Sequence, residues 1–170
     1  MLGFLFRALT AEPARGAALF DALTAEARQA HWYVEGAVPD TLDGRFAVLA
    51  TVASLAIVRL EREGEPGIAA SVALTERFIE VMESEHRELG LGDPTLGRTV
   101  RKLVGSLARR TELWRAALDA SADGFETTLE SLYNEDAPPV AVRHSADALK
   151  ALSERLCATR LDHLEQGKLA

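Results

Sequence analysis

The sequence FAVLATVASLAIV, residues 46–58, places no charged side chain in thirteen consecutive positions. Its alanine, valine, leucine and isoleucine residues fall on every side of a helix rather than on one stripe. A helix that is apolar nearly all round is normally the buried, central helix of a bundle. The run is also too short to cross a bilayer, which needs about 20 residues. It therefore predicts a core helix around which the rest of the chain packs.

The composition around this stretch favours helices throughout. Hydrophobic residues make up 48% of the 170 residues, while aromatic residues make up only 6%. A chain of this length is typical of one domain and buries about 70% of its unfolded surface. We therefore expect residues 1–170 to form one domain, an all-α compact bundle of five to six helices with a buried apolar second helix.

Proline- and glycine-rich breaks divide the chain into predicted helices. The breaks are GEPG (64–67), SADG (121–124) and APP (137–139). The expected helices cover about 12–33, 41–63, 68–89, 94–120, 125–134 and 140–166. In the fourth, apolar side chains three and four positions apart predict one buried stripe: Val100, Leu103, Val104, Leu107, Thr111, Trp114 and Leu118.

The start of the second helix, PDTLDGR (39–45), has an unusual density of polar residues. Thr41 is a plausible N-cap, and Asp43 falls in the first turn, where a carboxylate favours the helix dipole. Gly44 allows a close approach to the backbone. We expect Asp40, Asp43 and Arg45 either to form a local network that orients the first two helices or to contact a partner.

The fourth helix has a strong local positive charge. Six basic residues and one acid, Glu112, lie between residues 94 and 118. Four of the basic side chains fall away from the apolar stripe: Arg98, Arg101, Lys102 and Arg109. This face is either a solvated surface or a docking patch for RNA, anionic lipid or an acidic partner.

Charge and cysteine content limit the classes of function. The formal net charge is −7, whereas a generic nucleic-acid-binding protein is usually basic; we expect no DNA binding. A single cysteine, Cys157, excludes an internal disulfide and fits a reducing cytosol. Its helical neighbours Leu152 and Leu156 favour a buried position for it. The apolar N-terminal segment, residues 1–6, shows no signal-peptide pattern; we expect it either to pack on the bundle or to contact a membrane surface.

No group of residues predicts catalysis. Glu83 and His86 have the Glu-x-x-His spacing of di-iron bundles, but those proteins need the pair twice. The residues three positions before the other histidines are arginine or alanine. The sequence contains no phosphate-binding glycine loop, GxSxG or CxxC motif. We expect no enzyme activity, no metal site and no cofactor.

Two stretches resemble the ubiquinol–cytochrome c chaperone family. One is VPDTLDGRF (38–46), followed by the apolar helix that ends in RLERE. The other is RELGLGDPTLGRTVRKLVGSLARRTELWRAAL (87–118). The resemblance is clearest over residues 13–120, and the chain looks like a bacterial member of the family.

The resemblance implies a non-enzymatic assembly factor. Such a protein receives newly made cytochrome b and assists assembly of the ubiquinol–cytochrome c reductase complex, together with a small partner protein near the ribosomal exit. It would be cytoplasmic or peripheral on the inner face of the plasma membrane. Its partner-binding residues would be Asp40, Asp43 and Arg45 at the helix start, with the basic face of the fourth helix docking on ribosomes or anionic lipid.

Two other functions remain open from the residues alone. One is a helical protein that binds haem or quinone between its second and third helices, as bundles readily do. The other is a general protein-interaction module with an unrelated partner.

Overall fold

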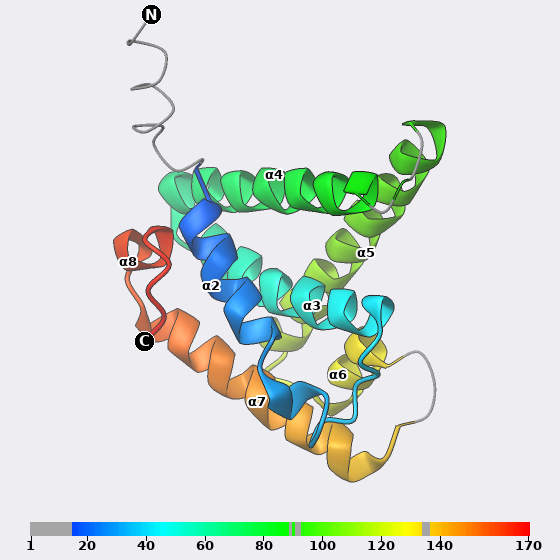
Figure 1. Cartoon of the computed structure of the whole chain (residues 1–170). Helices are drawn as coiled ribbons and strands as arrows, with labels where there is room; N and C mark the ends of the chain where they lie inside the picture. The colour runs from blue at the N-terminus through cyan, green and yellow to red at the C-terminus, as the bar shows by residue number, and fades with distance from the viewer. Residues whose placement is uncertain (1–14, 89, 91–92, 134–136) are drawn as a thin grey trace, which may run out of the picture.

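Helix α3 (Leu42–Glu61) is the centre of the fold in the computed structural model, which describes residues 15–88, 90, 93–133 and 137–170 (Figure 1). Thirteen of its twenty residues are buried. It contacts α2 (Ala17–Ala27), α4 (Gly64–Glu88), α5 (Asp93–Asp119), α6 (Phe125–Leu132) and α7 (Pro139–Ala158). The predicted buried second helix is confirmed.

The other helices surround α3 (Figure 1). α2 lies across it, α4 runs along one edge of the molecule, and α7 runs along the opposite edge. The short α8 (Leu161–Glu165) lies beside α2. The all-α class is confirmed, since the described residues form seven α-helices, one short 3-10 helix η1 (Ala30–Trp32) and no strand.

The first predicted helix, 12–33, is too long at its C-terminal end. α2 ends at Ala27, because two later side chains bind its last carbonyl groups. The Trp32 indole Nε1 donates to the carbonyl of Glu26 (2.9 Å), and the Tyr33 hydroxyl donates to the carbonyl of Ala27 (2.9 Å). These bonds satisfy helix-end acceptors and turn the chain back through η1.

The predicted break at 64–67 is displaced by a few residues. α4 already begins at Gly64, and Pro66 lies in its first turn, where a missing N–H costs nothing. Gly67 is buried at a close approach of α3, since a Cβ there would lie 2.0 Å from the Leu60 carbonyl oxygen. The tight α3–α4 turn therefore depends on this glycine.

The last predicted helix, 140–166, is divided into α7 and α8, which makes seven helices instead of the expected five to six. α7 ends at Ala158, where Arg59 of α3 donates to the carbonyl oxygens of Leu156 (3.1 Å) and Thr159 (3.2 Å). A guanidinium from the core helix thus replaces the next helical hydrogen bonds, and the chain becomes extended at Thr159.

The predicted stripe on α5 is confirmed. Val100, Leu107, Thr111 and Trp114 are buried, and the other three members are half-buried. The prediction for Cys157 is wrong, because this residue is exposed. The N-terminal segment, residues 1–6, lies outside the described part of the chain.

The connection between α2 and α3 is fastened to α7 by a buried polar network. The Tyr133 hydroxyl lies 2.5 Å from the Gly36 carbonyl oxygen and 2.9 Å from the Ser145 hydroxyl. Beside it, His31 Nδ1 lies 3.1 Å from His144 Nε2. Burial, and then the proximity of His144, lowers the pKa of His31. Tyr133 and two residues of α7 therefore hold the connection in place.

We expect Tyr133→Phe to lower the free energy of unfolding by about 1–3 kcal/mol, because the Gly36 carbonyl loses a buried donor. Urea unfolding followed by circular dichroism measures this change. Ser145→Ala and the double variant complete a thermodynamic cycle. Since both hydroxyls share one network, the double variant should cost less than the two single costs combined; strictly additive costs would contradict the network.

Candidate functional site

The start of α3 is built as its sequence predicts. The Thr41 side chain accepts a hydrogen bond from the Gly44 backbone N–H (3.1 Å), and Asp43 lies in the first helical turn. The Pro39 carbonyl oxygen lies 1.9 Å from the place where a Cβ at Gly44 would be. Gly44 is therefore required here because the preceding loop passes directly against the helix backbone.

Asp40 and Arg45 form an ion pair across this helix start, with 2.6 Å between Oδ1 and Nε. The hydrogen bond from Arg45 lowers the pKa of Asp40. Both side chains are more than half exposed, so the pair adds little to stability. Asp43 has no ion pair among the described residues. The expected network is therefore a pair of residues with a third carboxylate beside it.

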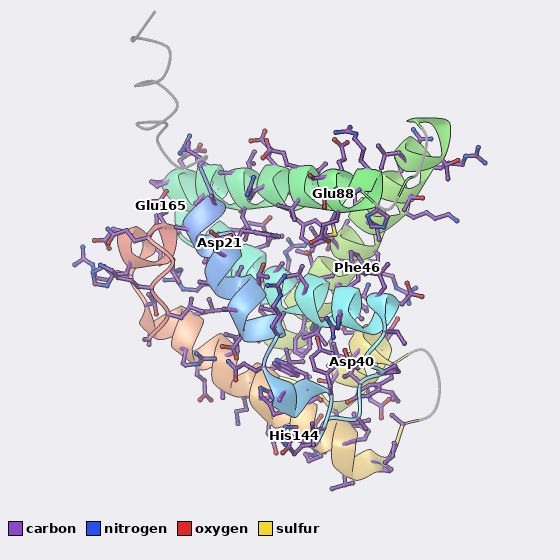
Figure 2. All side chains as sticks on the ribbon, in the orientation of Figure 1. Asp21, Asp40, Phe46, Glu88, His144 and Glu165 are labelled. Carbon is purple, nitrogen blue, oxygen red and sulfur yellow. The ribbon has the colours of Figure 1, made fainter. Side chains whose placement is uncertain are left out.

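These three residues lie on the rim of an open cleft of about 1140 Å³. Its walls are α2, the loop before α3, the N-terminal half of α3 and the C-terminal half of α4, with Leu103 of α5. Four of the lining residues are labelled in Figure 2 and mark the walls of the cleft. Asp21 belongs to α2, Phe46 to α3 and Glu88 to α4, and Asp40 belongs to the loop before α3.

Apolar side chains form the floor of the cleft. The largest are Phe20, Phe46, Leu49, Val81, Met82 and Leu103. Phe46 is held by an edge-to-face contact with Phe78 of α4 (6.0 Å between ring centroids) and by the Arg110 guanidinium over its ring (5.9 Å). Val34 and Leu42, at the rim, are 72% and 59% exposed. The cleft is thus a surface where large apolar groups meet solvent.

Charged side chains surround this floor. Among the described lining residues there are five carboxylates and three guanidiniums. Two polar atoms in the cleft, Thr24 Oγ1 and Arg77 Nε, are buried and have no hydrogen-bond partner within the described residues. His86 Nδ1 donates to the Met82 carbonyl oxygen (2.8 Å). The cleft therefore combines an apolar floor with a rim on which carboxylates outnumber guanidiniums.

The basic face of α5 is a separate surface. Arg98, Arg101 and Lys102 are exposed and belong to no ion pair of the described chain. Arg109 binds Glu130 of α6, although its side chain remains 69% exposed. None of these four residues lines the cleft. The structure therefore brings together the three predicted residues at the start of α3. It places the predicted basic residues of α5 on a different surface.

Sequence reasoning missed the α4 wall of the cleft. Glu85 and Glu88 were part of a charged helix end, a pattern that usually indicates solvation. Nothing local in the sequence shows that this end lies opposite α2 and the start of α3. The available signal was apolar residues in polar surroundings: Val34 shortly before the 39–45 stretch, and Leu42 within it.

In the described part of the chain, no group of three or more His, Cys, Asp or Glu residues is placed to hold a metal ion. No described helix is long and apolar enough to cross a membrane.

Comparison with known proteins identifies the family. The family model described as ubiquinol–cytochrome C chaperone matches residues 35–169, which include the start of α3, the α4 wall and the basic face of α5. The chain belongs to this chaperone family. The match continues past residue 120, where the resemblance in the sequence was no longer recognisable.

A solved structure supports this assignment of the chaperone family. The crystal structure of the Cbp3 homolog from Brucella abortus matches with a TM-score of 0.76 and 26% sequence identity. The match covers 100% of this chain and 96% of that one. No curated protein sequence matches.

We expect Gly44→Ala to lower the free energy of unfolding by about 1–3 kcal/mol, because the new methyl group would overlap the Pro39 carbonyl. Gly105→Ala is the matched control: Gly105 is also helical, but it is exposed and nothing lies within 4 Å of an added Cβ. The control should gain about 0.5–1 kcal/mol from helix propensity. Urea unfolding of both variants measures the contrast, and equal effects would contradict the close approach.

Proposed function

We propose that this protein is a non-enzymatic assembly factor that binds newly made cytochrome b and assists assembly of the ubiquinol–cytochrome c reductase complex. Membership of the chaperone family supports the general role. The cleft beside the start of α3 is the proposed binding site for the client. The protein acts in the cytoplasm or at the inner face of the plasma membrane, alone or with a small partner protein.

The observation that carries this proposal is the size and lining of the cleft. Small-molecule pockets usually measure about 300–1,000 Å³, and this cleft is larger and open. Its apolar floor suits the side chains of an apolar helix lying in a groove.

One contact favours a second candidate, a haem- or quinone-binding site. Because His86 donates through Nδ1 to the Met82 carbonyl, its Nε2 carries the free lone pair of the neutral ring. Both residues line the cleft. A Soret band on haem titration, or fluorescence quenching on quinone titration, that disappears in His86→Gln would support this candidate over a protein client.

The basic face of α5 is proposed to dock the chaperone where its client emerges. Arg98, Arg101 and Lys102 project three and four residues apart, so they share one face of the helix. Exposed basic side chains next to an anionic membrane each contribute about 1 kcal/mol of attraction. Ribosomal RNA presents the same kind of anionic surface.

We expect the double variant Val34→Asp/Leu42→Asp to lose client binding, because it places two charges among the exposed apolar groups of the cleft. When it is purified from a deletion strain that expresses it, this variant should carry less bound, pulse-labelled cytochrome b than the wild type does. It should also fail to restore b-type haem in dithionite-reduced membrane spectra and ubiquinol–cytochrome c reductase activity. Both substituted side chains are exposed, so the fold should remain.

The matched control is Val72→Asp/Val140→Asp. These side chains are 51% and 78% exposed and lie outside the cleft. The control should restore cytochrome b and reductase activity like the wild type. Full activity of the cleft variant, or equal loss in both variants, would contradict the proposed site.

We expect Arg98→Glu/Arg101→Glu/Lys102→Glu to release the protein from ribosomes or anionic vesicles at low salt, because three attractions of about 1 kcal/mol each become repulsions. Co-sedimentation measures the bound fraction. The control Lys150→Glu/Arg160→Glu/Lys168→Glu makes the same change in net charge at other exposed positions. Unchanged sedimentation of the folded α5 variant would refute the docking patch.

A further inference from the structure

The rim of the cleft carries more carboxylates than basic side chains. Asp21 on α2, Asp43 on α3, and Glu85 and Glu88 on α4 line the cleft without an ion pair among the described residues. Two of the three arginines there already contact carboxylates, Arg45 with Asp40 and Arg77 with Glu80. Since the third arginine, Arg28, is the only other guanidinium of the described lining, the five carboxylates give this lining a net negative charge.

The four carboxylates come from three different helices and are all exposed. They surround an apolar floor that includes the buried Phe20 and Met82. Charge repulsion between carboxylates on facing walls is relieved when a cation lies between them. An anionic occupant would meet the same carboxylates as repulsion, in a cleft where the apolar floor weakens screening by water.

We propose that the cleft selects apolar segments that have a positive charge at their end. Its occupant is the end of a membrane-spanning helix, where apolar turns are followed by lysine or arginine. This inference rests on the proposed function, because it assigns an occupant to the client cleft. Membrane proteins concentrate lysine and arginine at the cytoplasmic ends of their helices. The floor would then hold the last apolar turns, and the carboxylates would hold the flanking cations.

The selection has a consequence for orientation. The cleft would bind the cytoplasmic end of a client helix and leave the remaining apolar length outside. An apolar segment with acidic flanks would be excluded although it offers the floor the same contacts. Charge complementarity of this kind mainly sets specificity and the rate of association, and it weakens with salt.

Three fluorescent leucine–alanine peptides test the inference: one with two terminal lysines, one with two terminal glutamates and one with two terminal glutamines. Fluorescence anisotropy measures their affinity for the full chain at low and at physiological salt. We expect the lysine peptide to bind about tenfold more tightly than the glutamate peptide, a difference of about 1.4 kcal/mol. The preference should shrink as salt is added.

The variant Asp21→Asn/Asp43→Asn/Glu85→Gln/Glu88→Gln should lose this preference and still bind the glutamine peptide, because it leaves the apolar floor unchanged. The matched control is Glu126→Gln/Asp147→Asn/Glu154→Gln/Glu165→Gln. These carboxylates are exposed, lie outside the cleft and change the net charge equally. The control should keep the preference, since the effect belongs to the rim and not to total charge.

The outcomes separate the two proposals. If all three peptides bind equally and all lose affinity in Val34→Asp/Leu42→Asp, the cleft binds apolar segments but the charge selection is overturned. If no peptide binding depends on the cleft residues, the proposed client site fails as well. Equal loss of preference in the rim variant and its control would overturn the selection. A third outcome is that the wild type forms a concentration-dependent dimer, that only the rim substitutions abolish this dimer, and that no peptide is preferred. This outcome would overturn the selection and assign the cleft to a second copy of the chain.

Discussion

The complete burial of the middle of α3 is the constraint on which the rest of the structure depends. Because its apolar side chains point in every direction, five other helices must contact it. Burying each large apolar side chain contributes about 1.5–3 kcal/mol, so the enclosure of this one helix is a major part of the stability. Its N-terminal turn reaches the surface, and the cleft opens there.

Much of the fold could be predicted from local sequence. The Thr41 cap, the extent of α3 and the buried stripe of α5 depend on residues within the same helix, so periodicity and capping rules suffice. The two wrong boundaries have different causes. Arg59 binds the end of α7 from ninety-seven residues away, and no local pattern carries that information. Trp32 lies only six residues after Glu26, but its bond to the Glu26 carbonyl forms because the chain turns back there, and helical periodicity does not show such a turn.

The candidate site shows the same division. The Asp40–Arg45 pair could be predicted because its partners are five residues apart. The α4 wall could not, since forty or more residues separate Glu85 from the start of α3 and only the packing brings them together. On α5, the sequence predicted an outward basic face, but the bond from Arg109 to Glu130 depends on where α6 lies. Charge patterns locate a face, and tertiary packing decides what it meets.

The close approach of Pro39 to Gly44 determines how the cleft can deform. With no space between the loop and the helix backbone, the loop cannot swing without taking the start of α3 with it. α4 is anchored differently, by backbone contacts in its first half: Gly67 against Leu60, and Ala73 against Gly16. The C-terminal half of α4 has no such backbone contact among the described residues and is held by side chains, Phe78 and Met82, which are buried against the core. The two walls of the cleft are therefore fixed by different means: backbone packing holds the start of α3, and side-chain packing holds the facing part of α4.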